Sequence, residues 1–460
     1  MQVDAIIIGA GQAGPAIGTT LAKEGARVVI LEGDRLGGTC LNYGCRPTKA
    51  LRASARVAHL ARRGAEFGVK TGKVEVDFAT VMARKDDMIG GMQQSLDDAM
   101  HDMKNIEVIY EYAHFLGTEN GLHRVQAGDR VLEAPEVYIN TGARAVIPPI
   151  DGLDNVPYVT NEGLLALKEL PSHLVIIGGG YIGLEFGQMF RRFGSEVTII
   201  EGKPHVASRE DDDIVEAIES ILLDEGIRLF TGHKVKSVAP GYDDQIELTL
   251  LEGEARAVVR GSHLLVATGR RPNSDKLNLE AVGVKTNERG YIVTNDRYET
   301  NVPGIWALGD VNGRGAFTHT SYQDYEIFVA NRKGGDRSAN ERYTTYAMFI
   351  DPPLGRVGMS ERQARESGRN VLKAVVPMEN VSRAILDSET NGLIKVLVDA
   401  DTEQILGAAA LGMQGDDVIA IFSNFMYTGA SYKVMRDALP IHPTVAEFIP
   451  TLLNRLRPLD

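Results

Sequence analysis

Two cysteines are the residues in this sequence best suited to redox chemistry. Cys40 and Cys45 are the only cysteines in a chain of 460 residues, and four residues separate them. Two thiols this close together can form and break a disulfide during turnover. The pair therefore predicts a redox centre. It lies within Gly37-Gly38-Thr39-Cys40-Leu41-Asn42-Tyr43-Gly44-Cys45-Arg46-Pro47-Thr48-Lys49.

Three alternative roles for the cysteine pair remain open but are weaker. A disulfide staple across so short a loop would stabilise the fold by only about 2 kcal/mol, through lost entropy of the unfolded chain. A chain of this length does not need that contribution. A metal half-site would lack the second pair of cysteines or histidines that zinc requires. Two unconnected buried thiols are common in proteins, but the glycine-rich setting and Pro47 argue against them.

The N-terminal glycines predict a dinucleotide-binding unit ahead of the cysteines. Gly9, Gly11 and Gly14 follow a short apolar run and precede a helical stretch, and a second apolar run ends in Glu32, 18 residues after Gly14. Such glycines let the backbone approach a pyrophosphate at a helix N-terminus, and the acid can accept hydrogen bonds from a ribose.

The same pattern occurs again later in the chain. Gly178, Gly180 and Gly183 follow another apolar run, and Glu201 comes 18 residues after Gly183. Two units of matched dimensions predict two dinucleotides that exchange electrons.

The position of the cysteines assigns a cofactor to each unit. The pair follows Glu32 by a few residues, so the first nucleotide lies near it, and a redox-active disulfide needs a two-electron relay such as a flavin. We therefore expect FAD in the first unit and a nicotinamide nucleotide in the second. Glu201 favours a free 2′-hydroxyl, hence NAD(H); Lys203 and Arg209 leave NADP(H) open.

Composition limits the classes of partner. With 43% hydrophobic residues, the chain is long enough for two to four domains, and its formal charge of −13 disfavours nucleic acid or an anionic membrane as partner. The first residues lack a basic leader, and no window has the roughly 18 apolar residues of a membrane helix. We expect a reducing cytoplasm, where a cysteine pair is more often catalytic than structural.

Two further positions could take part in chemistry. Asp310 follows a strand-like run, which would place its carboxylate at a strand end where it can bind a ribityl hydroxyl. His442 is followed five residues later by Glu447, close enough across a turn to accept a ring N–H and fix the tautomer.

Together these motifs resemble the class I pyridine nucleotide-disulfide oxidoreductases, which include dihydrolipoamide dehydrogenase, glutathione reductase and mercuric reductase. The resemblance covers essentially the whole chain. It rests on the cysteine stretch, the doubled glycine motif, Ala267-Thr268-Gly269-Arg270-Arg271-Pro272-Asn273, Ala307-Leu308-Gly309-Asp310 and His442-Pro443-Thr444 with Glu447.

The resemblance implies an α/β fold with two Rossmann-like dinucleotide-binding domains and a C-terminal α+β dimerisation domain. The implied domains are an FAD-binding domain at 1–148, an NAD(P)-binding domain at 149–270, a central domain at 271–342 that completes the FAD site, and a dimerisation domain at 343–460. Within the last, apolar periodicity predicts a helix over 416–428.

The resemblance also implies a role for each site residue. Cys45 would be the flavin-side thiol and Cys40 the thiol that attacks the substrate. Lys49 and Glu185 would pair beside the flavin, although a solvated helix carboxylate is an alternative for Glu185. Tyr181 would cover the flavin until nicotinamide arrives, or would simply pack. Further cofactor contacts are implied for Gly38, Thr39, Gly142 and Gly269.

In the family, the pair equivalent to His442 and Glu447 comes from the partner subunit, which implies a homodimer with a shared active site. The expected function is an FAD-dependent NAD(P)H:disulfide oxidoreductase that acts on a small disulfide or dithiol, as dihydrolipoamide dehydrogenase does. The alternatives are a mercuric-reductase-like metal or quinone reductase and a non-catalytic redox-sensing flavoprotein. Mercuric reductases carry a second, C-terminal cysteine pair that this sequence lacks.

Two arginines near the cysteines could influence the substrate. Arg46 follows Cys45 directly, where dihydrolipoamide dehydrogenases commonly have a small aliphatic residue, and Arg52 lies further along the same predicted helix. They would either lower a thiol pKa and attract an anionic substrate, or be solvated surface charges.

Overall fold

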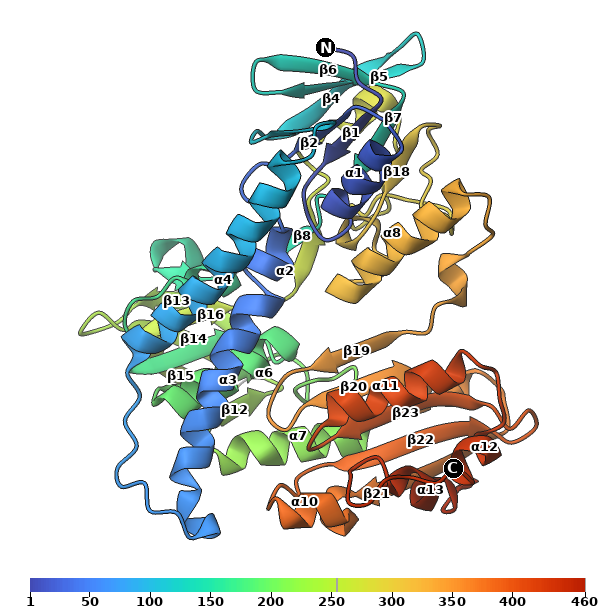
Figure 1. Ribbon diagram of the computed structural model, residues 1–460. Helices are drawn as coiled ribbons and strands as arrows, with labels where there is room; N and C mark the ends of the chain where they lie inside the picture. The colour runs from blue at the N-terminus through green and yellow to red at the C-terminus, as the bar shows by residue number, and fades with distance from the viewer. Residues whose placement is uncertain (254, 460) are drawn as a thin grey trace.

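The structure is a computed structural model that describes residues 1–253 and 255–459. Residues 254 and 460, which fall in the predicted second and fourth domains, lie outside the described residues. Figure 1 shows the blue N-terminal unit at one end of the molecule and the orange and red C-terminal domain at the other, with the green second unit beside the latter. None of the helices in the described ranges is both long and apolar enough to cross a lipid bilayer.

The first sheet is parallel and belongs to the first glycine motif. It contains β1 (Ala5–Ile8), β2 (Val28–Leu31), β3 (Ile106–Ile109), β7 (Glu136–Ile139) and β18 (Ile305–Ala307). The strand order is β18-β7-β1-β2-β3, and α1 (Gly14–Lys23) connects β1 to β2. Buried branched residues fill β1 and β2, as expected of parallel strands covered on both faces. Because β18 comes from much later in the chain, the segment after the second unit returns to complete this sheet.

The second sheet repeats this arrangement. It contains β9 (Tyr158–Val159), β10 (His173–Ile177), β11 (Glu196–Glu201), β12 (Arg228–Thr231) and β16 (His263–Val266). The order is β12-β11-β10-β16-β9, again parallel, and α6 (Tyr181–Phe193) connects β10 to β11. The chain therefore has the two Rossmann-like units that the glycine motifs predict.

The C-terminal domain contains an antiparallel sheet. Its strands are β19 (Thr345–Met348), β20 (Leu354–Gly358), β21 (Val371–Pro377), β22 (Leu393–Asp399), β23 (Ile405–Leu411) and β24 (Arg457–Pro458). The order is β19-β20-β23-β22-β21-β24. The helix predicted over 416–428 is α11 (Gly415–Met426), which packs on β20 and β23.

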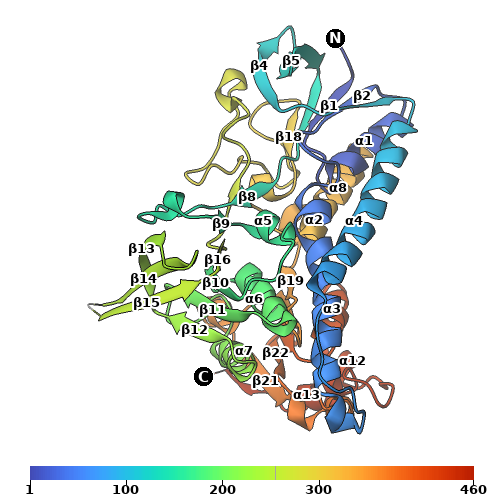
Figure 2. The ribbon, with the colours of Figure 1, turned by 90° about the vertical axis from the view of Figure 1, so that its left-hand side faces the viewer.

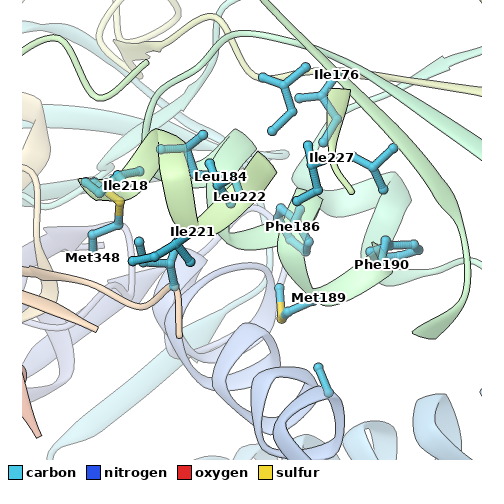
Figure 3. Close-up of a cluster of buried hydrophobic side chains, with 14 of the residues drawn as sticks. Ile176, Leu184, Phe186, Met189, Phe190, Ile218, Ile221, Leu222, Ile227 and Met348 are labelled. Atoms are coloured by element: carbon cyan, nitrogen blue, oxygen red, sulfur yellow. The ribbon is translucent and has the colours of Figure 1, made fainter. Parts of the chain in front are cut away.

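A large hydrophobic cluster joins the second unit to the C-terminal domain. Phe186 and Phe190 of α6 pack with Leu222 of α7 (Asp212–Asp224), and Met348 of β19 reaches the same cluster (Figure 3). Truncating a buried phenylalanine in such a core costs about 3–5 kcal/mol. The two domains therefore share one core and hold a fixed relation to each other.

Two long helices run along the side of the molecule, and the first of them begins at Cys45. After α2 (Gly38–Asn42), α3 (Cys45–Arg62) packs against α6 of the second unit and against α4 (Phe78–His101). Figure 2 shows α3 and α4 extending from the first unit down toward the C-terminal domain. The N-terminus of α3 therefore lies where the units meet.

The remaining elements flank these units. Small antiparallel sheets are formed by β4 (Ala113–Glu119), β5 (Leu122–Ala127) and β6 (Arg130–Ala134), by β13 (Lys234–Pro240), β14 (Ile246–Glu252) and β15 (Ala255–Gly261), and by β8 (Ala143–Ala145) with β17 (Arg270–Pro272). The other helices are α5 (Asn161–Leu165), α8 (Thr318–Arg332), α9 (Glu361–Glu366), α10 (Ser382–Leu386), α12 (Tyr432–Arg436) and α13 (Phe448–Leu453).

Candidate active site

The two glycine motifs form the same tight turn. Gly9 and Gly178 have φ angles of +93° and +115°, and a Cβ on either would lie within 2.5 Å of a backbone oxygen. A Cβ on Gly14 would lie 2.4 Å from the Gly9 oxygen, and one on Gly183 would lie 2.1 Å from the Gly178 oxygen. Only glycine allows helix and strand to pack this closely, which leaves each helix N-terminus accessible to a phosphate.

The acid of each motif is held in the same way. Glu32 accepts hydrogen bonds from the backbone N–H groups of Ala10 (2.7 Å) and Asp34 (3.0 Å). Glu201 accepts them from Gly179 (2.8 Å) and Lys203 (2.9 Å). Burial raises the pKa of Glu32, and the backbone N–H groups oppose that shift. Both carboxylates are fixed at the end of a strand, where lone pairs remain for ribose hydroxyls.

The middle glycines of the two motifs differ in the space around them. A Cβ on Gly180 would meet nothing within 4 Å, and one on Gly11 would meet the Asn140 side chain at 2.9 Å. The tight turns, the accessible helix N-termini and the fixed acids of both motifs thus fit the two dinucleotides expected from the sequence.

The cysteine pair lies at the beginning of two helices. Cys40 is half-buried within α2, and Cys45 is the first residue of α3. Their sulfurs are not bonded to each other in this structure. The turn that enters α2 has positive φ at both Gly37 (+94°) and Gly38 (+57°), which accounts for the glycine pair.

The surroundings of the two thiols favour charge on Cys45. A hydrogen bond from Cys40 lowers the pKa of Cys45 to about 6, with help from Thr318 and the Lys49 ammonium and against burial and Glu185. The shared bond and burial raise the pKa of Cys40. In the reduced pair at neutral pH, Cys45 is therefore the thiolate and Cys40 keeps its proton.

Lys49 and Glu185 form an ion pair between α3 and α6. The Lys49 Nζ lies 3.0 Å from Glu185 Oε2 and 4.3 Å from the centroid of the Phe349 ring. The Phe349 N–H donates to Glu185 Oε1 at 2.8 Å. Because only 4% of Glu185 is exposed, the alternative of a solvated helix carboxylate is wrong.

A cavity of about 1020 Å³ connects the first glycine turn with the cysteine pair. Twelve of the predicted site residues line it, and so do residues of α8, β19 and α11. The predicted residues in its lining are Gly9, Gly11, Glu32, Gly38, Thr39, Cys40, Cys45, Lys49, Gly142, Tyr181, Glu185 and Asp310. The predicted residues outside its lining are Gly14, Gly178, Gly180, Gly183, Glu201, Gly269, His442 and Glu447.

Asp310 and Tyr181 both line this cavity. Asp310 follows β18, and burial raises the pKa of its carboxyl, although Arg270 at 3.8 Å opposes the shift. Tyr181 is the first residue of α6, and its ring centroid is 5.9 Å from that of Phe317. This position suits a ring that covers the flavin and also one that only packs, so the covering role stays a prediction.

His442 and Glu447 interact directly but do not line the cavity that holds the cysteines of their own chain. The His442 Nδ1–H donates to Glu447 Oε2 at 2.8 Å. The His442 side chain is 76% exposed, at the surface of the C-terminal domain. The pairing predicted from their spacing is present, and the imidazole is free to meet another molecule.

Arg46 and Arg52 have different environments. Arg46 is exposed, and its Nη1 donates to Met92 Sδ at 3.5 Å. Arg52 donates to the Ile350 carbonyl at 3.1 Å and forms an ion pair with Asp351 at 3.4 Å. The alternative of a solvated surface charge is wrong for Arg52, because its guanidinium ties α3 to the segment before β20.

Two residues in or near the site had no signal in the sequence. Thr318 contacts Cys45 from 273 positions away, with its Oγ1 3.2 Å from the sulfur. Asn140 accepts from the Gly14 N–H at 3.0 Å and donates to the Leu308 carbonyl at 2.8 Å, which joins the first glycine turn to β18. A lone threonine or asparagine is common in turns and caps, so sequence alone does not mark either.

Two models of one protein family match nearly the whole chain. Residues 3–324 match the family model described as pyridine nucleotide-disulphide oxidoreductase, and residues 344–453 match the dimerisation domain of the same family.

Three relatives cover nearly all of the chain. A probable pyridine nucleotide-disulfide oxidoreductase, RclA of Escherichia coli, is 37% identical over 99% of this chain and 100% of the relative. Mercuric reductase of Lysinibacillus sphaericus is 33% identical over 96% of this chain and 81% of the relative. Dihydrolipoyl dehydrogenase of Cupriavidus necator is 32% identical over 97% and 96%. A solved structure of RclA, described as a Cu(II) complex of an HOCl-induced flavoprotein disulfide reductase, superimposes with a TM-score of 0.88 at 36% identity over 98% of this chain and 99% of that one.

Proposed function

The chain belongs to the pyridine nucleotide-disulphide oxidoreductase family, and on that premise we propose that it moves electrons between NAD(P)H and a small disulfide or dithiol through Cys40 and Cys45. As a member it is an enzyme that uses FAD and NAD(P)H. When bound, these cofactors supply the two-electron chemistry between nicotinamide and the thiols. The observation that carries the proposal is the position of both cysteines in one cavity with the first glycine turn and the Lys49–Glu185 pair.

The thiols would carry out two exchange steps in the reductive direction. The Cys40 thiolate attacks one sulfur of the substrate disulfide, and the other half leaves as a thiolate that takes a proton from the His442 imidazolium. The Cys45 thiolate then attacks the Cys40 sulfur, releasing the second half and forming the Cys40–Cys45 disulfide. The substrate gains the two electrons that the cysteine pair loses, and a dithiol substrate reverses both steps.

Cys40 needs a base because its pKa is raised by the bond with Cys45 and by burial. Glu447 accepts a hydrogen bond from the Nδ1–H of His442, so Nε2 is the ring nitrogen that can accept a proton. Since His442 is exposed and outside the cavity of its own chain, we assign this role to the partner subunit's His442. The matched dimerisation domain supports the homodimer that this requires.

Glu201 supports NADH as the nucleotide of the second unit. Its carboxylate is fixed at the end of β11, where a 2′-phosphate would meet its negative charge. The Lys203 Nζ, which could favour a phosphate, is bonded instead to Ser208 Oγ at 2.9 Å.

A thiol pair that cycles with NAD(P)H suits a reducing compartment, so we place the protein in the cytoplasm. Its formal charge of −13 supports a small-molecule substrate and gives no support for nucleic acid or an anionic membrane as partner.

Anaerobic reduction of the purified holoenzyme with NADH tests the proposal. We expect a long-wavelength absorbance band from the Cys45 thiolate against the flavin. Cys40→Ser should keep the band in the resting enzyme and lose turnover of disulfides, and Cys45→Ser should lose both. If Cys40→Ser still turns over a disulfide at an undiminished rate, the assignment is wrong.

Metal-ion reduction is the second candidate. One relative is a mercuric reductase, and the solved structure of another holds Cu(II). Against it, the described residues contain no cluster of three or more His, Cys, Asp or Glu side chains that could hold a metal. Initial rates with lipoamide, glutathione disulfide, coenzyme A disulfide, Hg(II), Cu(II) and a benzoquinone will distinguish the candidates, since a disulfide reductase should use one of the first three best.

A further inference from the structure

A hydroxyl from a distant helix contacts the Cys45 sulfur. Thr318 is the first residue of α8, and its Oγ1 lies 3.2 Å from Cys45 Sγ. Both side chains line the cavity described above. A hydroxyl can donate to a thiolate, and hydrogen bonds to charged groups are stronger than those between neutral groups.

The two helices that meet at this contact both favour negative charge. Cys45 is the first residue of the 18-residue α3, and Thr318 is the first residue of the 15-residue α8. The N-terminus of a helix carries a partial positive charge that stabilises a thiolate within its first turn. The Cys45 sulfur therefore lies between two such ends, and Thr318 connects it to the second.

Other groups also face the two sulfurs. Lys49 of α3 lowers the pKa of Cys45, whereas Glu185 of α6 raises it. Arg46 and Thr318 lower the pKa of Cys40, but its bond with Cys45 and burial outweigh them. His319 lines the same cavity, but its Nε2 is bonded to the Thr345 carbonyl at 2.7 Å.

The beginning of α8 holds Thr318 in place. The preceding residue, Phe317, has its N–H and its carbonyl both bonded to the Thr320 hydroxyl, at 3.2 Å and 2.7 Å. The Phe317 ring stacks on Tyr346 with centroids 5.6 Å apart and tilts against Tyr181 at 5.9 Å. Packing on both sides thus fixes the backbone that presents the hydroxyl.

We propose that Thr318 is a positioning residue that donates a hydrogen bond to the Cys45 thiolate and stabilises negative charge on that sulfur. This inference rests on the proposed function, in which Cys45 is the thiol beside the flavin. It adds a residue from the predicted central domain (271–342) to the redox centre. Thr318 forms and breaks no bond to substrate in this role.

The test is the pH dependence of the long-wavelength band in reduced holoenzyme. Thr318→Val keeps the shape of the side chain and removes the hydroxyl, so the pH midpoint of the band should rise by about 1 to 2 units, the effect of losing a hydrogen bond to a charged group. Thr318→Ser should restore the midpoint of the unmodified enzyme. Thr345→Val is the matched control, because Thr345 lines the same cavity but its hydroxyl bonds the Tyr343 carbonyl and not Cys45.

A second readout keeps the test valid if the valine variant binds flavin poorly. In a Cys40→Ser background, the pH dependence of Cys45 alkylation by iodoacetamide, followed by mass spectrometry, should show the same shift. An unchanged midpoint in Thr318→Val, or an equal shift in Thr345→Val, would overturn the role of Thr318 alone. Absence of the band from correctly flavinated, unmodified enzyme would instead overturn the placement of Cys45 beside the flavin, and the inference with it.

Discussion

At the scale of single residues, one proton is shared between two sulfurs, and the neighbours of each sulfur decide where it resides. Cys45 has the Lys49 ammonium, the Thr318 hydroxyl and a helix N-terminus, whereas Cys40 is half-buried and carries the shared proton. The pKa of Cys45, about 6, means that its thiolate persists above that pH and is lost below it. A reduced pair of this kind keeps the negative charge on Cys45 until a base removes the proton from Cys40.

The positive charge of Lys49 should stabilise the folded protein. Lys49→Met leaves Glu185, which is 4% exposed, without its cation, and we expect a loss of about 1–2 kcal/mol in the free energy of unfolding. The loss stays below that of a fully buried pair because the Lys49 side chain is 33% exposed. Urea unfolding measures it. Lys49→Arg, which keeps the charge, should lose less; equal losses would show that charge is not the cause.

Glu32 and Glu201, the acids of the two dinucleotide units, should each affect the binding of a different cofactor. Glu201→Ala should lower kcat/KM for NADH about 10-fold or more, the value of hydrogen bonds to a charged group, and should leave kcat/KM for NADPH unchanged or higher. Initial-rate kinetics with both nucleotides measure the ratio. Glu32 has the same geometry in the first unit, so Glu32→Ala should weaken FAD retention without changing that ratio. A changed ratio in Glu32→Ala would contradict the assignment of cofactors to units.

At the scale of elements, one buried carboxylate holds three segments together. Asp351, before β20, pairs with Arg52 and Arg56 of α3 and with Arg192 of α6. Burial alone would raise the pKa of Asp351, but the guanidinium groups of Arg192 and Arg56 outweigh it and hold that pKa below its usual range. These pairs fix α3, and hence Cys45 at its N-terminus, against the second unit.

Asp351→Asn should therefore be strongly destabilising. It leaves the arginines without a counter-charge, at an expected cost of about 3–5 kcal/mol in the free energy of unfolding. Because the native pKa is lowered, this stability is present above the ordinary carboxyl pKa of about 4 and is lost as pH falls through the native value. In thermal unfolding between pH 3 and 7, the Tm of the variant should fall less with decreasing pH than the Tm of the unmodified protein.

The control for that variant is an exposed ion pair. Asp387→Asn removes the partner of Arg383 on the surface, where such pairs contribute about 0.5 kcal/mol or less. If Asp387→Asn cost as much as Asp351→Asn, burial of Asp351 would not be the cause of its effect.

Elements with a local signal could be predicted from the sequence, and those that depend on distant pairing could not. The two glycine turns, their acids and α11 each follow from apolar periodicity and residue type within one short stretch. Thr318 and Arg52 did not follow, because the partner of each lies hundreds of residues away and no local pattern encodes that contact. A charged side chain such as Arg52 looks solvated until the fold supplies a buried carboxylate.

At the scale of the whole molecule, the C-terminal domain presents an apolar surface beside its histidine. Leu439 and Ile441 are 98% and 79% exposed, and they come just before the exposed His442. This segment lies inside the matched dimerisation domain. Large side chains so exposed in a monomer are typical of an interface, so we expect this loop to dock on the second copy and bring His442 to the partner's cysteines.

Mixing two inactive variants tests whether the histidine acts across the dimer. Cys40→Ser lacks the attacking thiol, and His442→Ala lacks the base, so each homodimer should be nearly inactive with disulfides. After subunit exchange, half of the dimers carry one chain of each kind. In these, one site combines an intact cysteine pair with the partner's intact His442, and the other site has neither.

The mixture should therefore recover about a quarter of the activity of the unmodified enzyme, since half of the dimers have one working site of two. A histidine that served the cysteines of its own chain would give no recovery, because no chain in the mixture carries both intact groups. Unmixed variants incubated under the same exchange conditions are the control, and native mass spectrometry measures the heterodimer fraction. Recovery in proportion to that fraction supports the shared site, and heterodimers without activity contradict it.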